Sequence, residues 1–516
     1  MRVTNNMINM HSQTNINSVK NMVDKYNDQM TNQNKISKPS DDPVIAIRSL
    51  RLRDSLNEVS QYVEKNIPDA ESWMEVTETS LNNMEQVLDD IYENCVYGST
   101  GTLTSEDRNT LLENLTKLVE QLYAEGNTDY AGRTVFTGYK TNTTLTFQSD
   151  DTAIQYEITE TMDIKDLTTK KFFTNELTLP ATDAEIYAGY PLEEQQKEVT
   201  VDRIRLAYDK TIEGSLPTVA IGDKKLEDMS VTYTDQNGAT QTSSVVYTEI
   251  TYDDWANQDF AVEPNQAYYI ASTGELILGS AVAESIRVQA AADKNFSMEV
   301  TYEKKGFDAG DVRPEMYFKC SNITDSANPI AYTREDQDIS YTISANLEMK
   351  VNTQAGEDGI LSTSIARDVD ELLDAVTRAQ NAAKKVTSIE GMLKNVSYAE
   401  DDAQAALKEW LNAAKKEQTL ADEHLQTLFT NGISLFQGYK DVVDLAKTDV
   451  GSRANRLQLV KTRMTTQQST IKTLISRNED REMSDILIDY KAAYTAYESS
   501  LSAASKANTT SLLDFL

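Results

Sequence analysis

The segment Lys38–Pro43 reads KPSDDP and separates two stretches that both have helical periodicity. Pro39 and Pro43 lack an amide hydrogen and fix their own backbone dihedral angle, so we do not expect one helix to run through the segment. Asp42 is suited to cap the next helix and Pro43 to occupy its first position, while Asp41 adds negative charge at the positive end of the helix dipole. The segment therefore predicts a hinge and an immediate helix start, formed by Pro39, Ser40, Asp41, Asp42 and Pro43.

Apolar residues recur at heptad spacing near both ends of the chain. Before the hinge, steps of three and four residues predict a coiled-coil helix over residues 3–34, with the seam Ile16, Val19, Val23, Tyr26 and Met30. Near the carboxyl end the helical phase breaks at residues 478–481, and a second seam follows, made of Met483, Leu487, Tyr490, Tyr494, Tyr497 and Leu501. Two such helices can pair only if the chain doubles back. We interpret these residues as an assembly seam in a hairpin-shaped chain.

Composition divides the rest of the chain into three parts. Amphipathic helical patterns cover residues 43–140 and 355–477, whereas threonine, tyrosine, valine and turn signals dominate residues 141–354. The predicted fold is mainly α with a β insert. Its domains are the amino-terminal inner coiled-coil helix (1–42), the two halves of a helical shaft (43–140 and 355–477), a β-rich outer variable insert (141–354) and the carboxyl-terminal inner coiled-coil helix (478–516).

Proline and glycine residues predict several helix ends and turns inside these parts. Pro68 is expected to close the first shaft helix, and Gly126 to stop the third. In the insert, Asn237-Gly238 and Thr273-Gly274 are expected at hairpin turns between alternating residues. The stretch 403–428 is a candidate for a separate helix ahead of a longer one.

The charge is strongly negative but unevenly distributed. The formal net charge is −33, which argues against a nucleic-acid-binding role, because basic side chains are needed to neutralise phosphates. Residues 1–40 carry five basic and two acidic side chains, and residues 450–516 carry nine and seven, so the ends together are +5 and the remainder is −38. Like copies of the ends can therefore approach one another with little repulsion, while the middle is suited to solvent.

Membrane, secretion and disulfide signals are missing from the sequence. No apolar run is long enough to span a bilayer, and the polar, Asn-rich amino terminus has no apolar core of a signal peptide. The two cysteines, Cys95 and Cys320, do not make a disulfide framework and are expected to be buried and reduced. We expect a cytoplasmic protein, or one exported by a route that reads another signal.

The terminal helices are not expected to fold alone. Ordering a helix of some 30 residues costs about 1–2 kcal/mol of backbone entropy per residue. The few seam residues of one helix recover only a small part of that free energy, so an isolated helix is marginal at best. We therefore expect both ends to be disordered in the free chain and to become helical on assembly. An ordinary intramolecular bundle is the alternative that periodicity leaves open.

Motifs for catalysis or metal binding are weak. The chain has two histidines, His11 and His424, and no HExxH motif, so a zinc protease in the insert is excluded. The residues Gly138-Tyr139-Lys140-Thr141 lack the spacing of a phosphate-binding loop and are interpreted as a turn. Acidic pairs such as Asp41-Asp42 have no EF-hand spacing and are expected at helix starts and solvated faces. The sequence predicts no enzyme, no catalytic residue, no metal site and no cofactor.

Three segments together resemble a known superfamily. They are NKISKPSDDPVIAIRSLRLR (residues 34–53), GRTVFTGYKT (132–141) and SLLDFL (511–516). They resemble the flagellins and, more closely, the family of hook–filament junction proteins known as hook-associated protein 3. In that family a Pro-Ser-Asp-Asp-Pro motif follows the first helix, whereas filament flagellins usually have alanine-type residues around the Asp-Asp pair. The remaining matches are Gly132, Phe136, Gly138, Lys140, Thr141 and the ending Ser511 through Leu516.

The resemblance covers about the first 145 and the last 160 residues and implies a structural role. It implies an inner coiled-coil layer, a helical shaft and outward β domains, in a ring between the hook and the flagellin filament. The implied partners are copies of the chain itself, the hook-side junction protein (hook-associated protein 1), flagellin and a flagellar export chaperone. The implied location is the extracellular bacterial flagellum, reached by the flagellar type III export route.

Two other interpretations remain open at the level of sequence. A filament flagellin needs the same coiled ends, so periodicity alone does not separate it from a junction protein. An insert that carries an enzyme is poorly supported by the residues present, whereas a sugar- or surface-binding β domain within residues 141–354 is compatible with them.

Overall fold

The computed structural model describes residues 5–101, 103–191, 195–222, 224–234, 238–294, 296–333 and 337–509. The chain forms two compact units, which are described separately. The first contains residues 1–71, 340–349 and 453–516, and the second contains residues 72–339 and 350–452. The predicted class is confirmed: long helices dominate, and the strands concentrate in the middle of the sequence.

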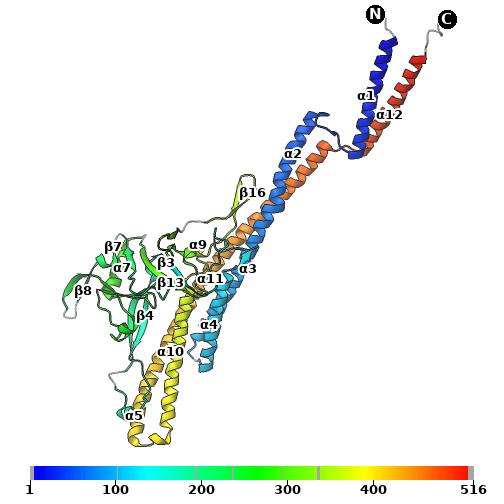
Figure 1. Ribbon diagram of the computed structural model, residues 1–516. Helices are drawn as coiled ribbons and strands as arrows, with labels where there is room; N and C mark the ends of the chain where they lie inside the picture. Colours follow the sequence, from blue (N-terminus) through cyan, green and yellow to red (C-terminus); the bar gives the residue numbers. More distant parts are fainter. Residues whose placement is uncertain are drawn as a thin grey trace, which may run out of the picture. The chain divides into compact units, whose positions relative to one another are not determined.

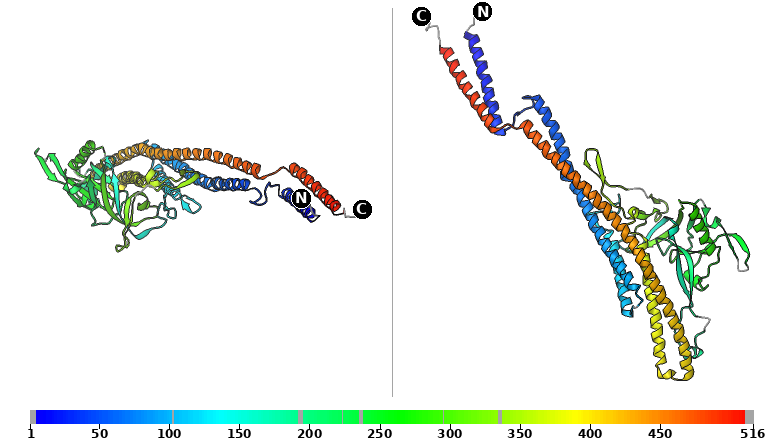
Figure 2. Two further views of the ribbon diagram at one scale, coloured as in Figure 1. Left: turned by 90° about the horizontal axis from the view of Figure 1, so that it is seen from above. Right: turned by 180° about the vertical axis from the view of Figure 1, so that it is seen from behind.

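The first unit is built from helices near the two ends of the chain. They are α1 (Asn5–Asn32), α2 (Pro43–Gln61), α12 (Met483–Thr509) and the carboxyl-terminal part of α11 (Asp401–Glu479). Helices α1 and α12 lie side by side (Figures 1 and 2). Side-chain contacts join α2 to α11; for example, the buried Gln468 donates to Ser60 and Glu64 at 2.9 Å each. A hairpin of β16 (Ser340–Ser344) and β17 (Leu347–Lys350) contacts the π-helical turn η1 (Tyr62–Asn66) that follows α2, since Asn66 donates to the carbonyl of Thr342 at 2.7 Å.

Pro68 does not end the first shaft helix as predicted. The chain stays helical from α2 through a π-helical turn, η1 (Tyr62–Asn66), into α3 (Ile67–Gly98). In this turn the amide of Ile67 donates to the carbonyl of Tyr62, five residues back. The wider turn lies directly before the proline, where a regular helix would lose a hydrogen bond and clash with the ring. The proline is therefore accommodated by a local change of helix type.

The helices of the second unit bury the apolar stripes that the sequence predicts. The part of α11 up to residue 452 accompanies α3, α4 (Ser105–Glu125) and α10 (Ser364–Leu393). Buried residues on α4 and α10 include Leu111, Leu115, Leu122, Ile365, Val369, Leu372 and Val376. Gly126 caps α4 as expected.

The stretch 403–428 is not a separate helix, because it belongs to the 79-residue α11. Two glycines allow close packing between α3 and α11. A Cβ atom at Gly432 would lie 3.2 Å from the sulfur of Cys95, and one at Gly98 would overlap the ring of Phe429. Isolated glycines inside a helix are tolerated where a neighbouring element approaches closely.

The insert folds around two larger sheets. One has the order β10-β11-β12-β5-β4 and the other β15-β14-β3-β13-β6-β7. Their strands are β3 (Asp151–Met162), β4 (Leu167–Thr174), β5 (Lys197–Arg205), β6 (Thr218–Ile221), β7 (Lys224–Lys225), β10 (Val246–Glu249), β11 (Gln266–Ile270), β12 (Glu275–Leu278), β13 (Met298–Phe307), β14 (Lys319–Asn322) and β15 (Ile330–Tyr332). Smaller elements are β1 (Asp129–Tyr130), β2 (Arg133–Thr134), α5 (Asp183–Ala188), α6 (Tyr252–Ala256), α7 (Ser280–Ala292), α8 (Pro314–Tyr317) and α9 (Ala355–Asp358).

Both predicted hairpins are present. Strands β11 and β12 pair on either side of Thr273-Gly274, and Gly274 has φ +59° with the backbone of Tyr208 so close that a Cβ atom would overlap it. Glycine is therefore required there for both conformation and space. Strands β8 (Ser230–Thr234) and β9 (Thr240–Ser244) pair around the second predicted turn. Asn237 itself lies outside the described residues.

Further sequence expectations concern cysteines and membranes. Cys95 and Cys320 are both buried and free, as expected. Among the described residues, no helix is long and apolar enough to cross a membrane.

Candidate functional site

Two helix interruptions lie next to each other in the first unit. Helix α1 gives way to α2 through residues 33–42, and α11 gives way to α12 through residues 480–482. The breaks are joined by a single antiparallel bridge between Asn34 and Asp480. On its two sides, the amide of Lys35 donates to the carbonyl of Glu479 at 2.7 Å, and the amide of Arg481 donates to the carbonyl of Gln33 at 2.9 Å. We call residues 33–42 and 478–482 the paired hinge.

The helix start predicted at the hinge is confirmed. The carboxylate of Asp42 accepts from the amides of Val44 and Ile45 at 3.0 and 3.1 Å, and Pro43 occupies the first turn of α2. Asp41 has a different role from the one expected. Its carboxylate accepts from the amides of Lys38 and Ser37 and closes the turn before the helix, and these hydrogen bonds lower the pKa of Asp41. Asp42 alone therefore caps the helix.

Gln29 connects the two halves of the hinge. Among the described side chains of α1 it is the buried one, with 4% of its surface exposed. Its amide nitrogen donates to the carbonyl of Lys35 at 2.6 Å, and its amide oxygen accepts from Arg481 at 3.0 Å. The same guanidinium lies 5.7 Å from the ring centre of Tyr26 and pairs with Asp489 on α12. A single buried polar residue in an apolar seam is a known way of fixing register.

The end of α11 is held by groups from the first break. The ammonium of Lys35 donates to the carbonyl oxygens of Arg477 and Asn478, which caps the negative end of the helix. The carboxylate of Glu479 accepts from Ser49 and from Arg53 on α2, the latter at 2.6 and 3.0 Å. The hydrogen bonds from Arg53 hold the pKa of Glu479 below its ordinary value. The paired hinge is thus a polar joint with no catalytic arrangement among its residues.

The predicted seam on α1 faces α12. Its five residues, Ile16, Val19, Val23, Tyr26 and Met30, are all half-buried, and α1 packs against α12. On the described part of α12 the buried residues are two that the predicted seam did not include. Ile486 and Ala493 are 0% and 8% exposed, and Ala493 is small enough for close approach of two helices.

The remaining seam residues on α12 form a second stripe. Tyr490 and Tyr497 are half-buried at its border. The other four are between 42% and 44% exposed: Met483, Leu487, Tyr494 and Leu501. Their steps of four and seven residues keep them on one side of the helix, next to the face that contacts α1. We call these four residues the α12 stripe.

Sequence reasoning found the two breaks but not the residues that join them. Gln29, Lys35, Arg53 and Glu479 are ordinary polar residues in polar surroundings, and their pairing depends on contacts between distant segments. Gln29 gave one usable signal, because it lies three residues after Tyr26 and thus on the apolar side of α1.

Both ends of the chain are similar to helical regions of known proteins. Residues 3–141 match the bacterial flagellin N-terminal helical region, and residues 439–516 match the bacterial flagellin C-terminal helical region. These segments include the paired hinge, both terminal helices and the ending SLLDFL, whose residues 511–516 lie outside the described part of the structure.

Curated relatives are similar over a shorter stretch. The chain is 34% identical over 120 residues to flagellar hook-associated protein 3 of Escherichia coli K12 and 32% identical over 118 residues to that of Salmonella typhimurium. Each match covers 23% of this chain and 38% or 37% of the relative. A solved structure of flagellar hook-associated protein 3 from Legionella pneumophila aligns with 83% of this chain and 97% of its own, at 10% identity and a TM-score of 0.29. The amino- and carboxyl-terminal regions of the chain are thus similar to the corresponding helical regions of bacterial flagellins.

Proposed function

We propose that the protein is a structural subunit of the bacterial flagellum that forms the junction ring between the hook and the flagellin filament. The observation that carries the proposal is the α12 stripe. One side of α12 is occupied by α1, and the adjacent side presents apolar residues at heptad spacing without cover in the described residues. A second copy of the same helix pair offers the matching apolar surface. The flagellin-type match of these terminal regions supports the same role.

The terminal helices are proposed to become ordered only on assembly. Within the described part of α1 and α12, three side chains are buried, Gln29, Ile486 and Ala493. This is little burial for two helices of 28 and 27 residues, since helical order in water depends on tertiary packing. The inner coiled-coil layer would thus form as copies come together. The positive ends of the chain favour that contact, and the acidic remainder favours solvent.

The proposed partners follow from this role. They are further copies in the ring, the hook-side junction protein (hook-associated protein 1), flagellin and a flagellar export chaperone. The proposed route is export through the flagellar type III channel to the outside of the cell. A chain whose terminal helices form only on assembly can be exported with both ends unfolded.

The α12 stripe provides the test. We expect the double variant Leu487→Asp with Leu501→Asp to keep the second unit folded, judged by its thermal transition, but to prevent assembly, because two charges replace the apolar contact. Cells with this variant should release flagellin into the medium and build no filaments. The matched control is Thr495→Asp with Ser502→Asp, which adds the same charge at exposed polar positions of α12 away from the stripe. Normal filaments in the first variant would contradict the proposal.

Labelling in cells separates the junction from the bulk filament. An antibody against the insert should mark a thin band at the tip of the hook. Staining along the whole filament would instead indicate a filament flagellin and would contradict the junction role.

A further inference from the structure

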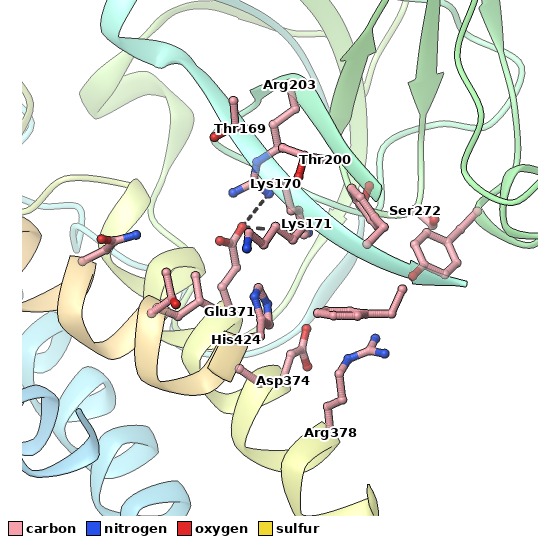
Figure 3. Close-up of a pocket in the computed structure, with 18 residues that line it drawn as sticks. Thr169, Lys170, Lys171, Thr200, Arg203, Ser272, Glu371, Asp374, Arg378 and His424 are labelled. Carbon is pink, nitrogen blue, oxygen red and sulfur yellow. Dashed lines mark ion pairs between the residues drawn. The ribbon is translucent and has the colours of Figure 1, made fainter. Parts of the chain in front are cut away.

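The second unit contains a cavity of about 490 Å³ that the proposed assembly role does not use. It lies between strands β4 and β5 on one side and helices α10 and α11 on the other (Figure 3). This volume is within the range of small-molecule sites, which combine an apolar wall with a few convergent polar groups.

One wall of the cavity is a rigid aromatic surface. Phe172 and Phe173 are buried, and Tyr252 and Leu428 are half-buried beside them. Phe172 packs 4.8 Å from the ring of Trp255 and 5.0 Å from that of Phe260, within one apolar cluster. The ring surface is therefore fixed by its neighbours.

Most of the charges at the cavity are already paired. Arg203 contacts Glu371 at 2.6 Å and also Glu275, while Lys170 contacts Glu275 at 2.9 Å. Burial acts against ionisation of Glu371, but the hydrogen bond and charge of Arg203 prevail and lower its pKa to about 2. Lys171 pairs with Glu198 at 2.7 Å. These groups form the back of the cavity and are held in place.

Arg378 is the remaining basic side chain of the cavity. Its guanidinium lies 5.1 Å from the ring centre of Phe173, and it has no ion pair within the described part of the chain. Asp374, one turn earlier on α10, is exposed and forms no ion pair with it. In total, four basic and two acidic side chains line the cavity: Lys170, Lys171, Arg203, Arg378, Glu371 and Asp374. Glu275 and Glu198, which pair with Lys170, Arg203 and Lys171, balance the remaining positive charges, so Arg378 is the group that offers an anion a contact.

His424 adds an unsatisfied polar atom. Its Nδ1 atom is buried and has no hydrogen-bond partner among the described residues, and its ring packs edge-on to Phe173 at 5.1 Å. Burial lowers the pKa of His424 to about 4, so the ring is neutral at physiological pH and can both donate and accept a hydrogen bond. A buried polar atom without a partner calls for an explanation, and a bound ligand supplies one.

Neutral polar side chains complete the lining. Thr169, Thr200, Ser272 and Asn431 all line the cavity, and their side chains make no hydrogen bond within the described residues. They come from different elements and surround the aromatic wall. Such a set of hydroxyl and amide groups suits a ligand that carries several hydroxyls of its own.

The geometry points to a binding site for an acidic sugar, a six-membered ring with hydroxyls and a carboxylate. The apolar face of the ring would lie on the aromatic wall, its hydroxyls would bond to the threonine, serine, asparagine and histidine side chains, and its carboxylate would pair with Arg378. No covalent step is involved. The site is independent of the terminal helices, so it does not depend on the proposed function.

The test measures binding to the full chain by titration calorimetry, with D-glucuronate, D-glucose, benzoate and inorganic phosphate as probes. D-Glucuronate should bind about tenfold more tightly than D-glucose, since the two share a ring and differ in the charge-assisted contact. Equal binding of these two sugars, or none of either, would overturn the assignment. Tighter binding of benzoate would indicate an aromatic acid site, and equal binding of phosphate a simple anion site, and each would overturn it as well.

Two pairs of variants locate the site. Arg378→Gln should weaken D-glucuronate binding about tenfold and leave D-glucose binding unchanged. The control, Arg456→Gln, removes an exposed arginine of α11 outside the cavity and should change neither. Thr427→Trp, at the exposed edge of the cavity, should block both sugars, whereas Thr430→Trp on the same helix should not. Unaltered D-glucuronate binding in Thr427→Trp would place the ligand elsewhere and overturn the proposal.

Discussion

Glu160 on β3 is a buried carboxyl group that we expect to make the stability of the fold depend on pH. It accepts hydrogen bonds from the hydroxyl of Tyr302 and from the amide of Ala207, the latter at 2.9 Å. Burial raises its pKa from 4.5 to about 7. Between these two values the folded protein keeps a proton that the unfolded chain has released. The free energy of unfolding therefore falls as the pH rises through this window.

Glu160→Gln removes this ionisation while keeping an acceptor for Ala207. From pH 4.5 to 7, the free energy of unfolding of the unmodified protein should fall relative to that of the variant by on the order of 3 kcal/mol. His424, whose pKa is lowered to about 4, contributes the opposite pH dependence. Because the unfolded chain binds this proton more tightly than the folded one, the free energy of unfolding rises with pH in the range where His424 titrates. This effect is present in both proteins and cancels in the difference. Denaturant titrations at several pH values supply the data, and a difference that does not change with pH would contradict the assignment.

Gln29 is the residue on which the paired hinge depends. Gln29→Leu leaves the carbonyl of Lys35 and the guanidinium of Arg481 without this partner. We expect a cost of about 1–3 kcal/mol to the hinge in the assembled protein, because polar groups lose a partner in a buried position. Hydrogen exchange of the amides of Lys35 and Arg481 should accelerate accordingly. Gln13→Leu, at an exposed position of the same helix, is the control, and equal exchange in both variants would rule out this role for Gln29.

At the level of elements, the cap of α2 sets where the shaft begins. Asp42→Ala removes the acceptor for the amides of Val44 and Ile45, and we expect a loss of about 1 kcal/mol with faster exchange of these two amides. Asp54→Ala is the matched control, since Asp54 is exposed on the same helix. Equal protection of the two amides in both variants would show that packing, rather than the cap, fixes the helix start.

Element types could be predicted from the sequence more reliably than element boundaries. The KPSDDP hinge, the phase break at 478–481 and the hairpins follow from local backbone chemistry, and all are present. The continuous helix across Pro68 was missed because a π-turn has no composition signal. The length of α11 was missed; its Gly432 packs against Cys95 of α3, a contact that only the fold brings about.

The candidate sites were less accessible to sequence reasoning. The seam predicted for assembly stays a prediction; on α12, periodicity gave weight to the large residues Leu487 and Tyr494, whereas the small Ala493 is the buried one. The cavity beside His424 could not be predicted, since its lining comes from segments of the chain more than 200 residues apart.

At the scale of the whole molecule, the central claim is that the terminal helices become ordered mainly through contacts with other copies of the chain. The helix pair α1 and α12 buries few side chains, while the helices and sheets of the second unit bury many. Stability within a protein is not uniform, and amide exchange reports it segment by segment. The two ends and the second unit should therefore behave differently in a free chain.

Hydrogen exchange of the full-length protein, in dilute monomeric solution and after assembly, tests this claim most directly. The account predicts that the amides of residues 5–32 and 483–509 exchange rapidly in the monomer, while those of α10 remain protected. After assembly, both terminal segments should become protected. Terminal segments that are already protected in the dilute monomer would contradict the account.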